Sequence, residues 1–234
     1  MLQVEKIKAI SLDLDDTLWP IWPTIERAEL ALHSWLSRHA AATAAMFSSS
    51  AALRALRLDM ERARPDLLHD MSALRRESIR LALTRAGDAP HLAEPAFEVF
   101  FTARQDVELY EDVLPALQQL ARRYPLVAVS NGNADVQRVG LGGYFKAALS
   151  AHSLGVAKPD PRIFEAAADA VGVQAHEVLH VGDDAALDVL GALDAGMQTV
   201  WVSRAPDAAW AHGQQPHLRV ANLAELCAAL RSPR

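Results

Sequence analysis

Four short apolar runs constrain the fold of this chain more than any other feature of its sequence. Short runs rich in Val and Leu are typical of buried strands in a parallel sheet, where both faces need apolar side chains. Segments with a helical pattern separate the runs, at Asp112–Arg123, Asp160–Val171 and Ala185–Ala195. Alternating strands and helices predict a doubly wound α/β fold with a parallel sheet. The predicted strands are Ile7–Leu12, Leu126–Ser130, Val178–Val181 and Thr199–Val202.

The segment from Trp19 to Leu109 interrupts this alternation, because it is rich in Ala, Leu and Arg and shows no strand pattern. We therefore predict an all-helical insert at residues 19–109. The α/β domain would then be discontinuous and consist of residues 1–18 and 110–234. The predicted helices of the insert are Ile21–His39, Ala51–Arg64, Met71–Ala86 and Pro95–Val107.

Composition and charge narrow the range of partners. The chain has 29 acidic and 23 basic side chains, a formal charge of −6, so general binding to nucleic acid or to an anionic membrane is not expected. No apolar run approaches the roughly 18 residues of a membrane-spanning helix, and the first residues lack the apolar stretch of a signal peptide. The single cysteine, Cys227, excludes an internal disulfide and fits a reducing compartment. We expect a cytoplasmic monomer or homodimer that acts on a small molecule.

Polar side chains gather where the predicted strands end. Ligands of an open parallel sheet bind outside the carboxyl ends of its strands. Because four separate segments deliver acids, a hydroxyl and a lysine to this edge, we expect one functional site there. These residues are Asp13, Asp15 and Asp16 after the first strand, Ser130 and Asn131 at the second, Lys158 before a helix, and Asp183, Asp184 and Asp188 after the third.

A cluster of several carboxylates at one site needs a cation to balance its negative charge. Carboxylates a few ångströms apart repel one another, so that one would take up a proton or destabilise the fold. Oxygen ligands favour Mg²⁺, which typically takes one or two carboxylates together with a substrate phosphate oxygen. The sequence has no set of Cys and His residues that would indicate zinc. We therefore predict a magnesium site.

Two of the acids, Asp13 and Asp15, have the spacing that phosphomonoester hydrolysis needs. This reaction depends on positioning and on neutralising charge on the phosphoryl oxygens. A carboxylate nucleophile divides it into two steps through an aspartyl phosphate. A second carboxyl can protonate the leaving oxygen and later activate water. The pattern D-x-D supplies both roles beside one metal ion.

Four motifs resemble those of the haloacid dehalogenase (HAD) superfamily, in the same order and with similar spacing. Each motif alone is weak, but the four together are specific. The resemblance implies a Rossmann-like core, and the predicted insert lies where the family has its helical cap, of type C1. The motifs are Asp13-Leu14-Asp15-Asp16-Thr17, Ser130-Asn131-Gly132, Lys158-Pro159-Asp160, and Gly182-Asp183-Asp184-Ala185-Ala186-Leu187-Asp188.

The resemblance also implies the chemistry at the first motif. Asp13 would be the nucleophile and Asp15 the general acid and base. The Asp13 and Asp183 carboxylates and the backbone carbonyl of Asp15 would bind Mg²⁺.

The remaining motifs would hold the phosphoryl group and balance charge. Ser130 and the backbone amide of Asn131 would bind the phosphoryl group. Lys158 would offset negative charge and orient Asp13. Asp188 would not bind the metal directly but would support the metal site or Lys158. Asp184 stands where many members of the family carry Ser, so its role at the metal stays open.

A narrower resemblance is to bacterial FMN phosphatases of the superfamily, and it extends nearly from end to end. It implies FMN or a phosphorylated uracil intermediate of riboflavin synthesis as the substrate. One matching stretch lies in the insert, where members of the family usually select their substrates. The matching stretches are Pro65–Leu83, Ser130–Ala134, Leu141–Phe145 and Leu179–Val189.

Other functions remain open on the same scaffold. A dehalogenase shares the fold and the nucleophile, but it does not place an acid at the second position of D-x-D, so Asp15 argues against it. A phosphomutase and a sugar or nucleotide phosphatase keep both acids. A regulatory or binding protein without activity is disfavoured, because Asp13, Asp15 and Lys158 are all present.

A few further residues have two interpretations. His180 lies within a predicted strand, and we expect a core residue rather than a metal ligand. Trp19 and Trp22 follow the first motif; they could stack on a flavin ring, but packing is favoured. His69 and Asp70 could touch substrate, but a surface histidine and a helix start account for them equally well.

Overall fold

The computed structural model describes residues 1–205 and 208–231. Two compact units make up the chain. The α/β unit comprises Met1–Pro20 and Glu108–Arg234, and the helical unit comprises Ile21–Val107. No helix in the described residues has both the length and the apolar character to cross a membrane.

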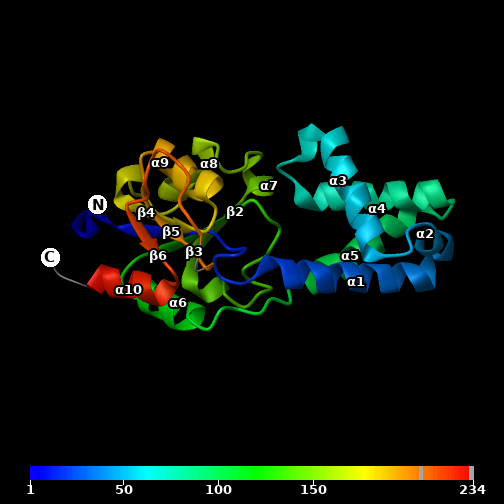
Figure 1. Cartoon of the computed structure of the whole chain (residues 1–234), viewed down its shortest axis with the longest axis horizontal. Helices are drawn as coiled ribbons and strands as arrows, with labels where there is room; N and C mark the ends of the chain where they lie inside the picture. The colour runs from blue at the N-terminus through cyan, green and yellow to red at the C-terminus, as the bar shows by residue number, and fades with distance from the viewer. Residues whose placement is uncertain (206–207, 232–234) are drawn as a thin grey trace. The chain divides into compact units, whose positions relative to one another are not determined.

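A parallel sheet forms the centre of the α/β unit, with its strands in the order β3-β2-β1-β4-β5-β6. Figure 1 shows α8 (Pro161–Asp169) and α9 (Gly191–Asp194) on one side of this sheet and α6 (Val113–Ala121) and α10 (Leu223–Arg231) on the other. The predicted doubly wound parallel fold is therefore confirmed. The strands are β1 (Ala9–Leu12), β2 (Leu126–Ser130), β3 (Phe145–Ser150), β4 (Val178–Gly182), β5 (Gln198–Val202) and β6 (Leu218–Val220).

The burial of each strand explains which strands the sequence predicts. Every residue of β1, β2, β4 and β5 is buried, so these strands are mainly apolar. The buried polar exceptions are Ser11, Ser130, His180, Gln198 and Thr199. The two edge strands are only partly buried. Their sequences, FKAALS and LRV, therefore lack that pattern, and neither was predicted. The observed β1 is also shorter than the predicted Ile7–Leu12, and the Ile7 N–H bonds back to the carbonyl of Val4 in the preceding 3₁₀ turn, Val4–Lys6.

Three helical segments of the α/β unit lie close to their predicted positions, whereas α7 (Ala151–Leu154) and α10 were not predicted. The predicted Asp112–Arg123 and Asp160–Val171 correspond to the shorter α6 and α8. The predicted Ala185–Ala195 is a π-helical turn, Ala185–Leu190, followed by the short α9. The helices are α6 (Val113–Ala121), α7 (Ala151–Leu154), α8 (Pro161–Asp169), α9 (Gly191–Asp194) and α10 (Leu223–Arg231).

The helical unit contains helices and no strand among its residues, as predicted. Two of the four predicted helices have the observed bounds, and the other two are shifted by up to three residues at either end. The short α2 was not predicted; Asp88 anchors it by accepting 2.7 Å bonds from the backbone N–H and the hydroxyl of Thr43. The helices are α1 (Ile21–His39), α2 (Ala41–Met46), α3 (Ser50–Ala63), α4 (Met71–Ala86) and α5 (Ala93–Arg104).

The helical unit has an apolar core of its own. Leu32 and Leu36 of α1 pack with Ile79 of α4 and with Phe97 and Phe100 of α5, and all five side chains are buried. At the start of α4, the Asp70 carboxylate accepts a 2.8 Å bond from the N–H of Ala73. Asp70 is therefore an N-cap residue, which is one of its two predicted interpretations.

Candidate active site

The strand order reverses around β1, so the carboxyl ends of β1, β2 and β4 meet at one edge of the sheet. A pocket of about 190 Å³ lies there. The residues that the sequence assigned to a site come together in this pocket. Its lining consists of Asp13, Asp15, Asp16, Ser130, Asn131, Gly132, Lys158, Asp183, Asp184, Leu187 and Asp188.

Asp13 is fixed at the end of β1 by both its backbone and its side chain. Its N–H donates a 2.9 Å bond to the carbonyl of Val181 in β4. Lys158 Nζ lies 2.5 Å from Asp13 Oδ1, and the Thr17 hydroxyl lies 3.2 Å from Oδ2. The carboxylate is only 9% exposed. Asp13 therefore has one orientation, with a cation directly beside it.

Asp188 is the second partner of Lys158. Lys158 Nζ donates to Asp188 Oδ1 over 2.6 Å, and the backbone N–H of Asp184 donates to Oδ2 over 3.0 Å. Gly182 makes this position possible, because a Cβ on that residue would lie 2.3 Å from Asp188 Cγ. A glycine is therefore required where the carboxylate of Asp188 packs on the backbone.

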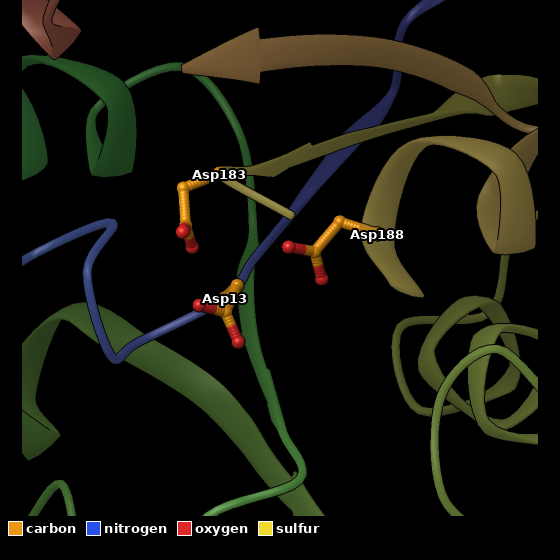
Figure 2. A group of neighbouring side chains, drawn as sticks. All are labelled: Asp13, Asp183 and Asp188. Carbon is orange, nitrogen blue, oxygen red and sulfur yellow. The ribbon is translucent and has the colours of Figure 1, made fainter. Parts of the chain in front are cut away.

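Three carboxylates form a cluster at this edge. One oxygen each from Asp13, Asp183 and Asp188 lies within 4.8 Å of the others. Figure 2 shows the three side chains converging, from the ends of β1 and β4 and from the turn after β4. The Thr17 hydroxyl lies 3.1 Å from Asp183 Oδ1 as well as close to Asp13, and so it bridges two of the three acids.

Burial and mutual repulsion act on the acids of the cluster. Burial, together with the nearby charges of Asp188 and Asp16, raises the pKa of Asp183 to about 7. Burial also raises the pKa of Asp13 well above its usual range, against the opposing effect of the Lys158 ammonium. Additional positive charge at this edge would therefore favour the ionised form of both acids.

Lys158 and Asp188 form a stable ion pair. Burial by itself would lower the pKa of Lys158, but Asp13 and Asp188 together raise it above its ordinary value. Burial acts against ionisation of Asp188 too, and the Lys158 ammonium nevertheless holds the pKa of Asp188 well below its usual range. The ammonium is therefore permanent, and it balances only one of the three carboxylates.

The loop after β2 is tied to the segment that carries Lys158. The Asn131 side chain donates to the carbonyl of Lys158 over 3.0 Å and accepts from its backbone N–H over 2.7 Å. The Ser130 hydroxyl accepts a 2.9 Å bond from the N–H of Gly132. The loop after β2 and the segment around Lys158 are thus held together at the pocket.

The turn after Asp13 orients Asp15. Asp16 has φ of +58°, a left-handed conformation that Asp tolerates better than most residues. Its N–H bonds to the carbonyl of Trp19 over 2.7 Å. Trp19 Nε1–H then donates a 2.8 Å bond to Asp15 Oδ1. The Trp19 ring is completely buried, so it packs as expected and presents no face to a flavin.

Three residues that sequence reasoning left out contribute to the site. Thr17 and Gly182 belong to the motifs, but their roles depend on side chains that only the fold brings close. Arg204 carries no sequence signal: its guanidinium bonds to the carbonyl of Thr17, 187 positions away, over 2.7 Å and to Asp112 over 2.7 Å.

Asp184, whose role the sequence left open, acts locally. Its Oδ1 accepts 2.8 Å bonds from the N–H groups of Ala186 and Leu187 and so caps the π-helical turn.

Comparison with known proteins finds relatives along nearly the whole chain. A family model described as haloacid dehalogenase-like hydrolase matches residues 7–196. The 5-amino-6-(5-phospho-D-ribitylamino)uracil phosphatase YigB of Escherichia coli is 34% identical over 94% of this chain and 95% of its own. The phosphoserine phosphatase of Thermus thermophilus is 33% identical over 94% and 98%. A crystal structure titled 2-haloacid dehalogenase, from Pseudomonas syringae, superposes with a TM-score of 0.87 at 38% identity, covering 96% and 98%.

Proposed function

The chain belongs to the haloacid dehalogenase-like hydrolase family and is a phosphoric monoester hydrolase, and we propose that it acts through a phosphorylated Asp13 with Mg²⁺ as cofactor. The observation that carries this proposal is the setting of Asp13. Its buried carboxylate lies 2.5 Å from a permanent ammonium and beside a second acid, Asp183, at the end of a parallel strand.

Two carboxyl groups suffice for the bond changes. An oxygen of Asp13 attacks phosphorus, and the bond from phosphorus to the ester oxygen breaks. Asp15, in its acid form, gives its proton to that leaving oxygen. Water then attacks the phosphorus of phospho-Asp13 while Asp15 takes its proton, and the bond from Asp13 to phosphorus breaks. The bond from Trp19 supports this role, because it orients the Asp15 carboxyl.

The pocket offers donors for the phosphoryl oxygens. Lys158 uses two of its three N–H groups on Asp13 and Asp188, and we assign the third to a phosphoryl oxygen. Ser130 and Asn131 line the same pocket, and we assign the Ser130 hydroxyl and the backbone N–H of Asn131 to the phosphoryl oxygens. These donors would stabilise charge that develops in the transition state.

The donor set fits Mg²⁺. One ammonium balances one of three clustered carboxylates, and the donors are all oxygen. Asp188 already accepts bonds at both of its oxygens. We therefore assign the metal to the Asp13 and Asp183 carboxylates and the Asp15 carbonyl, and Asp188 to Lys158. When bound, Mg²⁺ would keep Asp13 ionised and neutralise charge on the phosphoryl group.

Metal binding is expected to change stability as well as activity. Mg²⁺ at about 100 times its dissociation constant should raise the free energy of unfolding by about 2.7 kcal/mol. EDTA should abolish phosphate release. Asp183→Asn should lose both effects, whereas Asp169→Asn, an exposed acid at the end of α8, should retain them. Thermal denaturation with and without Mg²⁺, and a phosphate assay, provide the measurements. Equal turnover in EDTA would contradict the metal assignment.

The organic part of the substrate must be held by more than this pocket. A volume of about 190 Å³ lies below the roughly 300–1,000 Å³ of most small-molecule sites. We propose that the helical unit serves as the cap and selects the substrate. A phosphorylated ribitylaminouracil is the first choice, supported by the name of the Escherichia coli relative, and FMN is the other substrate that the resemblance in the sequence implies. The name of the Thermus thermophilus relative makes phosphoserine the first competitor in a substrate panel.

Dehalogenation is the second candidate function, because the Pseudomonas syringae structure bears that title. A halide leaves as an anion and needs no proton, so a dehalogenase has no use for the oriented carboxyl of Asp15. We expect phosphate release from FMN or an aryl phosphate, and no halide release from 2-chloropropionate. A phosphomutase would instead return the phosphoryl group to a second hydroxyl without releasing phosphate.

A further inference from the structure

Hydrogen bonds continue from the carboxylate cluster into the sheet, through two residues that the proposed reaction does not use. His180 Nε2 lies 3.3 Å from Asp188 Oδ1, and His180 Nδ1 lies 2.8 Å from the hydroxyl of Ser11. Ser11 and His180 are both completely buried. The connected side chains are Ser11, His180, Asp188, Lys158 and Asp13.

The partners of His180 determine which of its ring nitrogens carries the proton. Asp188 is ionised beside Lys158 and can only accept, so Nε2–H of His180 must donate to it. Nδ1 then accepts from the Ser11 hydroxyl. Burial lowers the pKa of His180, which agrees with a neutral ring. Both hydrogen bonds therefore point toward Asp188: the Ser11 hydroxyl donates to His180, and His180 donates to Asp188.

The sheet holds the ring in place. Ser11 of β1 and His180 of β4 are paired in the strand register. Ser11 lies in β1 two positions before Asp13, the residue that directly follows the strand. On its other side, the His180 ring meets the Phe164 ring edge to face, with centroids 5.0 Å apart and an interplanar angle of 84°. His180 thus occupies one orientation between two strands and α8.

We propose that His180, held by Ser11, is a positioning residue for phosphoryl transfer: it fixes the Asp188 carboxylate and, through it, the Lys158 ammonium against Asp13. The proposal rests on the proposed function. Lys158 Nζ lies between two carboxylate oxygens at 2.5 and 2.6 Å. A rotation of Asp188 would therefore draw the ammonium away from Asp13. The bonds from His180 and from the Asp184 N–H oppose this rotation.

Kinetics distinguish positioning from packing. His180→Phe removes the donor and is expected to lower kcat by about 10- to 100-fold, as removal of such supporting partners typically does. KM should change less than about threefold, because the groups that bind substrate remain. His180→Gln should recover part of kcat, since its amide can donate to Asp188. His217→Phe is the matched control: His217 accepts a 3.1 Å bond from the Thr199 N–H in the same sheet and should leave kcat unchanged.

A spectroscopic readout makes the test independent of turnover. The nitrogen-15 signal of the Lys158 ammonium should be visible and protected from exchange in the wild type and in His180→Gln. It should exchange faster in Ser11→Ala and faster still in His180→Phe. An unchanged ammonium signal in Ser11→Ala and His180→Phe, or wild-type kcat in His180→Phe, would overturn the proposal. If the wild type releases no phosphate, the proposed function fails, and the ammonium signal alone decides whether His180 positions Lys158.

Discussion

Replacing Asp13 by Asn is expected to lower kcat for phosphate release by at least about 10⁴-fold, because the reaction loses its nucleophile. The same variant should be at least as stable as the wild type in EDTA. Burial and neighbouring acids raise the pKa of Asp13, so a neutral amide removes repulsion while Lys158 keeps Asp188 as its partner. A phosphate assay and thermal denaturation measure the two effects.

Asp169→Asn is the matched control for this change, because it makes the same substitution at an exposed position of α8. It should leave kcat within about twofold of the wild type. Turnover of Asp13→Asn within tenfold of the wild type would contradict the role of Asp13 as nucleophile.

Replacing Lys158 by Met is expected to reduce the free energy of unfolding by about 3–5 kcal/mol, because it leaves buried acids without their cation. The ammonium is 3% exposed, and the Asp13 and Asp188 side chains are 9% and 2% exposed. Urea denaturation provides the measurement. Lys8→Met is the control; Lys8 also forms an ion pair, with Glu177, but its side chain is 63% exposed and the effect should be much smaller.

Combining Lys158→Met with Asp188→Asn tests whether the loss comes from the unbalanced acid. The double variant should recover part of the stability, because one of the charges left without a partner is gone. If the two single effects simply add, then Lys158 and Asp188 do not stabilise one another, and the interpretation of the ion pair is wrong.

The central strands were predictable because a strand buried on both faces is mostly apolar. β2, with Leu126 to Ser130 buried, is an example. The edge strands have no such requirement, and β3 alternates between partly buried and exposed residues in its first four positions. In the helical unit, α2 depends on Asp88, whose two bonds to Thr43 come from 45 positions away. The local periodicity of a sequence cannot predict contacts between residues this far apart along the chain.

The grouping of the site residues was predictable from topology, because parallel strands deliver their carboxyl ends to one edge. The individual contacts within the site were not predictable from topology. Arg204 reaches the turn at Thr17 only because β5 returns beside β4, and the role of Gly182 appears only once Asp188 packs on it. The catalytic roles, the metal ligands and the compartment stay predictions, since they concern ligands and behaviour rather than backbone topology. The bounds of the predicted domains stay predictions as well.

The role of Asp13 as nucleophile is tested most directly by whether a phosphoryl group appears on Asp13 during turnover. The enzyme, quenched in acid while it hydrolyses substrate with Mg²⁺, would be digested and analysed by mass spectrometry. We expect the mass of one phosphoryl group on the peptide that contains Asp13, and none in Asp13→Asn or in EDTA. Phosphate release at the full rate with Asp13 unmodified at every quench time, or with the label on another residue, would contradict this role of Asp13.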